Sequence, residues 1–236
     1  MDQTARDRRR PFSLQEQIRL IMPLLFIWSI GFIILAAVAA QGDAGQQVLD
    51  PTYSGGAAWH IGFVTSLSVL AWTCATVSSG WCSWVSAQGA RTGAARFMKG
   101  GAIVSAVFLV DDLFDIHAEA FPAIGLPRAA GALVLLAIAA LWAASQLHEA
   151  RRTRIQVLLA AFGAIAVSVL IEGLLDTADS RTSLLLSNGA KFLGILAWAC
   201  YFTVTARDIT RSVLYQSLVA PHTLAGRSGA QVPVAV

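Results

Sequence analysis

The sequence predicts an all-α fold: a polytopic membrane helical bundle with six transmembrane helices and both termini in the cytoplasm. The 236-residue chain is 56% hydrophobic and only 13% charged, whereas soluble globular domains contain about 25% charged residues. Its apolar residues form continuous runs of the length that crosses a bilayer as a helix. They do not alternate with polar residues as the strands of a membrane barrel do.

Six apolar segments are long enough to span a membrane of about 30 Å. These segments are residues 20–40, 60–87, 98–120, 128–147, 155–176 and 184–206. The breaks between them are mostly short, which favours antiparallel neighbours. We expect a cytoplasmic N-terminal segment (1–18), one transmembrane domain (19–206), and a cytoplasmic amphipathic segment with a flexible tail (207–236).

The basic residues set the predicted orientation. Of the 17 Lys and Arg residues, only Arg128, Arg181 and Lys191 lie toward the outer face in this topology. The positive-inside rule therefore places both termini in the cytoplasm. Anionic lipid accounts for the basic face, and we expect no nucleic-acid partner. The predicted location is a bacterial-type cytoplasmic (inner) membrane.

Hydroxyl and Trp side chains are frequent in this chain, but neither set indicates a ligand. Hydroxyls in membrane helices usually bond carbonyls of their own helix or of a neighbouring one. The seven Trp residues, with Trp81 and Trp84 near a span end, are mostly interpreted as interfacial anchors.

The most informative stretch is residues 107–121, which places four carboxylates in an apolar segment: Asp111, Asp112, Asp115 and Glu119. Each acid near the centre of a membrane helix costs about 2.5–3.5 kcal/mol, while each Leu or Phe returns only about 0.3–0.6 kcal/mol. Protonation, a basic partner, water or a bound cation must therefore neutralise the charge. On a continuous helix the four acids share an arc of about 100°, and His117 faces away from them.

Three other spans carry polar residues near the same outer surface. Glu172 and Asp176 end the fifth span, His60 begins the second, and Asn188 and Lys191 begin the sixth. We expect these residues to line one outward-facing pocket. The candidate metal ligands are Asp111, Asp112, Asp115, Glu172, His60 and His117, and the further pocket residues are Glu119, Asp176, Lys191 and Asn188.

The chemistry of this set favours a divalent cation. Carboxylates prefer Mg²⁺, Ca²⁺ or Mn²⁺, and an added imidazole favours Zn²⁺ or iron. We therefore predict a membrane protein with an acidic metal-binding pocket, either a membrane-embedded metal-dependent enzyme or a binding protein. The sequence indicates no catalytic residue.

Two alternatives remain open. In an accessory subunit of a larger respiratory or photosynthetic membrane complex, the acids would contact neighbouring helices or subunits. In an ion- or proton-coupled transporter, the clustered acids would relay charge. The expected partners are the lipid bilayer and either another membrane protein or a second copy of this chain.

Overall fold

The computed structural model describes residues 14–40, 62–175 and 181–227, and this part of the chain contains helices and turns without a strand. The all-α prediction is confirmed for these residues. The helices are α1 (Leu14–Ala40), α3 (Phe63–Gln88), α4 (Thr92–Phe114), α5 (Ile116–Ala123), α6 (Arg128–Ser145), α7 (Leu147–Ala150), α8 (Ile155–Leu175) and α9 (Arg181–Arg227).

Four helices are long and apolar enough to cross a membrane. Their apolar stretches are Leu20–Ala40 in α1, Phe63–Gln88 in α3, Ile155–Gly173 in α8 and Leu185–Gln216 in α9. The apolar stretch of α6 is shorter, Ala130–Ser145, and α4 carries charged residues near both ends. The prediction of membrane-spanning helices is thus confirmed, by length and composition, for α1, α3, α8 and α9.

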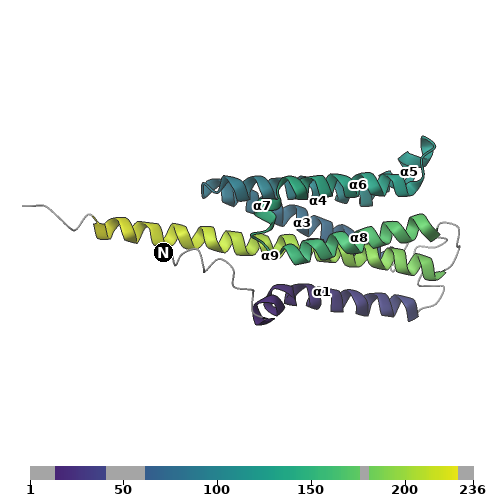
Figure 1. The fold of residues 1–236 in the computed structure, drawn as a ribbon, viewed down its shortest axis with the longest axis horizontal. Helices are drawn as coiled ribbons and strands as arrows, with labels where there is room; N and C mark the ends of the chain where they lie inside the picture. Colours follow the sequence, from purple (N-terminus) through teal and green to yellow (C-terminus); the bar gives the residue numbers. More distant parts are fainter. Residues whose placement is uncertain (1–13, 41–61, 176–180, 228–236) are drawn as a thin grey trace, which may run out of the picture.

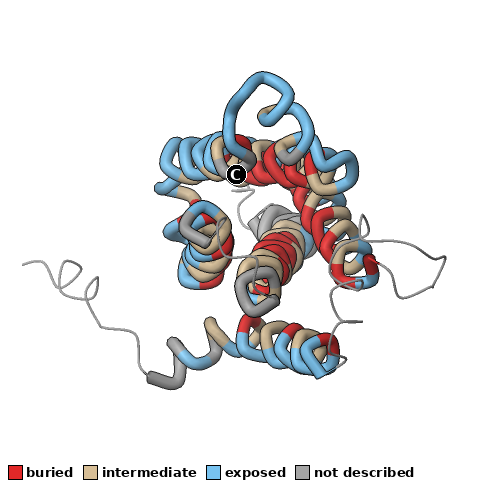
Figure 2. The backbone as a smooth tube through the Cα atoms, turned by 90° about the vertical axis from the view of Figure 1, so that its right-hand side faces the viewer, coloured by how far each residue is buried: buried red, intermediate tan, exposed pale blue. Residues whose placement is uncertain are grey.

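Helix α9 forms the centre of the bundle. Helices α1, α3, α4, α6, α8 and α9 run side by side along one axis (Figure 1). Helix α9 packs against α8, α3 and α1. Of the residues in its most apolar stretch, 61% are buried inside the bundle, against 33% or less in the other three candidate spans. Figure 2 shows the buried positions turned toward the interior of the bundle.

Aromatic side chains fill the middle of this bundle. Trp72 of α3 stacks on Phe108 of α4 with ring centroids 4.8 Å apart, and both rings contact Trp198 of α9. Trp72 and Trp198 are fully buried, whereas Trp81 and Trp84 are exposed. The interpretation of Trp residues as interfacial anchors therefore fails for Trp72 and Trp198.

The hydroxyls of α3 behave as the sequence predicts. Ser68, Thr73, Thr76 and Ser79 each donate a hydrogen bond to the carbonyl four residues earlier. These bonds satisfy the hydroxyls within α3 itself, so the four side chains are not available as a set for a ligand.

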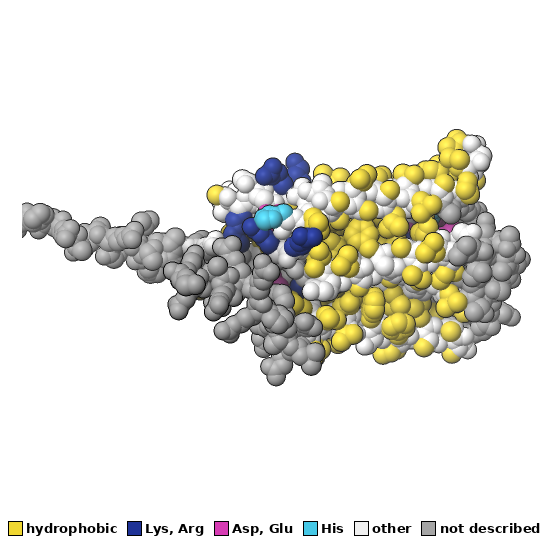
Figure 3. Space-filling model, in the orientation of Figure 1, with side chains coloured by type: hydrophobic (Ala, Val, Ile, Leu, Met, Phe, Trp, Pro, Cys, Tyr) yellow, Lys and Arg dark blue, Asp and Glu magenta, His cyan; other side chains and the backbone are white. Residues whose placement is uncertain are grey.

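The surface separates into an apolar belt and a basic end. Figure 3 shows hydrophobic side chains along the bundle, with Lys and Arg gathered at the end from which α9 extends. The first residues of α1 and the last residues of α9 lie at this same end (Figure 1). Residues 207–220, expected as a separate amphipathic segment, continue α9, which ends at Arg227.

Candidate functional site

The third predicted span is broken at Asp115, which corrects the sequence-based expectation of one helix over residues 98–120. Helix α4 ends at Phe114, Asp115 adopts the left-handed conformation (φ 50°, ψ 37°), and α5 begins at Ile116. Asp tolerates this conformation better than most residues, and a left-handed residue commonly ends a helix. The helical wheel is therefore valid only as far as Phe114, and of the four acids it describes only Asp111 and Asp112.

The break brings His117 onto Asp111. The backbone N–H of His117 donates to Oδ1 of Asp111 at 2.9 Å, and its ring Nδ1 lies 2.7 Å from Oδ2. In a continuous helix that N–H would bond the carbonyl of Leu113, so the Asp111 side chain replaces a helical acceptor. The expectation that His117 faces away from the acids was wrong, because it assumed an unbroken helix.

The second aspartate is held by two other helices. Oδ1 of Asp112 lies 2.6 Å from the ammonium nitrogen of Lys191 in α9, and the indole of Trp72 in α3 donates to Oδ2 at 2.9 Å. The Asp112 side chain is only 7% exposed. A carboxylate buried to this extent is stable when it is both paired and hydrogen-bonded, and both conditions are met here.

These groups line one small pocket of about 50 Å³. Its walls include five of the predicted site residues: Asp111, Asp112, His117, Glu172 and Lys191. The volume accommodates an ion with a few waters, and it lies far below the roughly 300–1,000 Å³ of sites for organic ligands.

The other predicted residues do not join this lining. Asp115 and Glu119 are exposed, since the break removes them from the face that carries Asp111. Asn188 is half-buried on α9, three residues before Lys191, and does not line the pocket. His60 and Asp176 lie outside the described residues.

Two of the lining residues that the sequence analysis missed carry a polar group, Ser168 and Trp72. Ser168 lies four residues before Glu172 on α8, so helical spacing was a usable signal for it. Trp72 had a weaker signal: an indole N–H in the middle of a span needs an acceptor, but only the folded bundle shows that Asp112 provides it.

A close contact with α6 fixes the position of His117. A Cβ added at Gly131 would lie 2.7 Å from Cβ and 3.1 Å from Cα of His117. Gly131 therefore allows α6 to approach α5 directly behind the imidazole. Within the described residues, no three His, Cys, Asp or Glu side chains are gathered as a preformed metal cage.

Comparison with known proteins places the chain in a family. The family match covers residues 20–205, which include all of α3 to α8, most of α1, the first half of α9 and the whole acidic pocket. The chain belongs to the family described as Domain of unknown function (DUF8692). No curated protein and no solved structure shows significant similarity to it. The geometry of the pocket therefore carries the functional argument for this DUF8692 protein.

Proposed function

We propose that this DUF8692 protein crosses the cytoplasmic membrane six times and binds a partly hydrated divalent cation in the pocket between α4, α5, α8 and α9. The observation that carries the proposal is the charge of the lining. Three carboxylates, Asp111, Asp112 and Glu172, line the pocket together with one ammonium, Lys191. With a neutral His117 the lining holds an excess of two negative charges, which favours a cation in a site surrounded by apolar side chains.

The ligands are the groups that the internal pairs leave available. The Nδ1 of His117 lies 2.7 Å from Oδ2 of Asp111, so Nε2 is the ring nitrogen left for a ligand. A histidine held by a carboxylate through its other nitrogen is the usual arrangement of a metal ligand. Glu172 contributes an oxygen from α8, while Asp111 positions the imidazole. The hydroxyl of Ser168 lies on the same wall, 3.4 Å from the hydroxyl of Ser187.

The aromatic cluster supports binding over transport. Trp72, Phe108 and Ile195 line the pocket alongside its polar groups, and Trp198 packs against both aromatic rings. A transporter would need a polar path through this region, and packed aromatic rings offer no groups to replace a hydration shell.

The cation proposal predicts a metal-dependent increase in stability that requires Glu172. A cation that binds only the folded state stabilises it by about 2.7 kcal/mol at a hundredfold excess over its dissociation constant. We expect one of Mg²⁺, Ca²⁺, Mn²⁺ or Zn²⁺ to raise the melting temperature of the chelator-treated protein in detergent. The Glu172→Gln variant should lose this response.

The matched control is Glu119→Gln, which removes an equal charge from an exposed position outside the pocket and should keep the response. Elemental analysis of the purified protein should find the same metal in a one-to-one ratio. If no metal is found and none in the panel changes the melting curve, the cation proposal is wrong. The contact between Asp111 and His117 and the ion pair between Asp112 and Lys191 would then be structural, as in an accessory subunit of a larger membrane complex.

The proposed topology has its own test. The topology is supported by the basic end of the bundle, because the start of α1 and the end of α9 both lie there (Figures 1 and 3). In a background without native Cys, we expect an impermeant maleimide to label Ile124→Cys in intact cells. Thr92→Cys, at the basic end, should be labelled only after permeabilisation. Both positions are exposed, and the reverse labelling pattern would invert the proposed orientation.

A further inference from the structure

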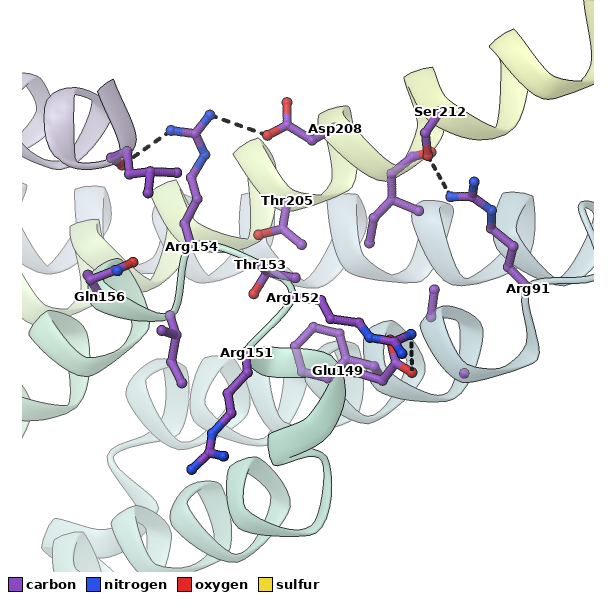
Figure 4. Close-up of a pocket in the computed structure, with 16 residues that line it drawn as sticks. Arg91, Glu149, Arg151, Arg152, Thr153, Arg154, Gln156, Thr205, Asp208 and Ser212 are labelled. Atoms are coloured by element: carbon purple, nitrogen blue, oxygen red, sulfur yellow. Dashed lines mark hydrogen bonds and ion pairs between the residues drawn. The ribbon is translucent and has the colours of Figure 1, made fainter. Parts of the chain in front are cut away.

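A second, larger cavity lies at the basic end of the bundle, at the opposite end from the acidic pocket. Its volume is about 730 Å³. Figure 4 shows that its walls come from the connection between α3 and α4, the connection between α7 and α8, and one side of α9. The proposed cation site does not involve this cavity.

Arginines dominate the polar part of its lining. Arg91, Arg151, Arg152 and Arg154 line the cavity together with two carboxylates, Glu149 and Asp208. This leaves an excess of two positive charges. Guanidinium groups match the oxygens of a phosphate in geometry and charge, so the cavity has the composition of an anion site.

The internal pairs leave part of this charge available. Nη1 of Arg152 lies 3.6 Å from Oε1 of Glu149. Nη2 of Arg154 lies 3.4 Å from Oδ2 of Asp208. Arg91 donates to the neutral hydroxyl of Ser212 at 2.6 Å. Among the described residues, neither Arg91 nor Arg151 has an acidic partner within ion-pair distance, so these two guanidiniums are the ones that an added anion would neutralise.

Two helices also begin at this cavity. Gly93 and Ala94 belong to the first turn of the 23-residue helix α4, and Ile155 and Gln156 begin the 21-residue helix α8. The side chain of Arg91, at the N-cap of α4, makes no capping hydrogen bond. The start of a helix has a positive dipole end, which favours an anion. The N–H of Ile155 already donates to the carbonyl of Thr153 at 3.0 Å, and the carboxylate of Glu149 lies beside the first turn of α4, where a Cβ at Gly93 would be 2.7 Å from its Oε1. The dipole ends, rather than free N–H groups, are therefore what these helices add.

The surroundings favour a lipid as the source of the anion. The walls of the cavity combine the arginines of the basic end with the apolar side chains of Leu20, Phe97, Ile155 and Ile209. A phospholipid headgroup presents a phosphate and a glycerol unit at this depth. Basic pockets between membrane helices on the cytoplasmic side are typical sites for anionic headgroups.

We propose that this cavity binds an anionic phospholipid headgroup on its arginine-lined walls, where Arg91 and Arg151 are the guanidiniums without an acidic partner, with the apolar wall residues against the glycerol and the first acyl carbons.

The test compares two double variants of the full-length protein in detergent, titrated with phosphatidylglycerol or phosphatidylcholine and followed by native mass spectrometry. The Arg91→Gln/Arg151→Gln variant should bind phosphatidylglycerol about tenfold more weakly than the unaltered chain, as expected for the loss of charge-assisted hydrogen bonds. The control is Arg96→Gln/Lys99→Gln. It removes two charges at the same end from exposed positions that do not line the cavity, and it should bind within about twofold of the unaltered chain.

The proposal is overturned if the two double variants lose affinity equally, or if phosphatidylcholine binds as well as phosphatidylglycerol. A third titration uses inorganic phosphate. Phosphate that binds with the same dependence on Arg91 and Arg151, without preferential phosphatidylglycerol binding, would assign the cavity to a soluble anion and overturn the lipid assignment. If the double variant does not fold, Arg151→Gln alone serves, because Arg151 is exposed and should lose several-fold in affinity.

Discussion

Replacing Lys191 with Met is expected to destabilise the folded protein by about 3 kcal/mol. Removal of one partner of a buried ion pair costs about 3–5 kcal/mol, because the remaining charge stays buried without compensation. The Asp112 side chain is 7% exposed and would retain only the hydrogen bond from Trp72. The lower end of the range applies because 38% of the Lys191 side chain is accessible. Reversible unfolding in mixed detergent micelles would measure the change.

The double variant Asp112→Asn/Lys191→Met should recover most of this loss, since it removes both charges and leaves an amide that still accepts from Trp72. Lys99→Met is the matched control. Lys99 is exposed at the basic end, so this change should stay within about 0.5 kcal/mol of the unaltered protein. A single Lys191 variant as stable as the parent would mean that Asp112 does not depend on this pair.

Replacing Gly194 with Ala is expected to destabilise the bundle by about 2–3 kcal/mol. Gly194 lies where α9 crosses α8, and its new Cβ would be 2.6 Å from Cγ1 of Ile165, 3.0 Å from the Ile165 backbone nitrogen and 3.2 Å from the carbonyl oxygen of Ala161. Two of these neighbours are backbone atoms, so the helices would have to separate. Small residues at such crossings allow membrane helices to approach closely.

The control for this change is Gly163→Ala on α8. A Cβ at Gly163 would meet nothing within 4 Å, so the higher helix propensity of Ala should make this variant neutral or more stable by up to about 1 kcal/mol. The free energies of unfolding of both variants, measured under the same conditions, separate the effect of crowding at the helix crossing from the general effect of losing a glycine. Equal stability of the two variants would show that the crossing tolerates the added methyl group.

The position of four pocket residues at one end of the bundle could be predicted from the order and length of the helices alone. Alternating helix directions place the end of the third span, the end of the fifth and the start of the sixth at one end of the bundle. Asp111, Asp112, Glu172 and Lys191 indeed line the same cavity. Their common depth was predictable because the length and order of the helices can be read directly along the sequence.

The orientation of His117 was not predictable in this way. Asp115 gives no sequence signal strong enough to break a helix, and the wheel therefore placed His117 on the wrong side. The left-handed turn at Asp115 is stabilised by contacts between segments: the two bonds from His117 to Asp111 and the close packing of Gly131 behind His117. The bonds to Asp111 are local, but the contact with Gly131 exists only once α6 has packed on α5.

The sequence by itself determined the all-helical class, the apolar segments and the end of the molecule at which the acids lie, because hydrophobicity and helical rise act along the chain. Tertiary structure decided which base pairs with which acid. It joined Asp111 to His117 and Asp112 to Lys191 and Trp72, and it placed Trp72 and Trp198 in the core. These choices depend on how helices rotate and approach one another, which is set by packing between side chains distant in the sequence.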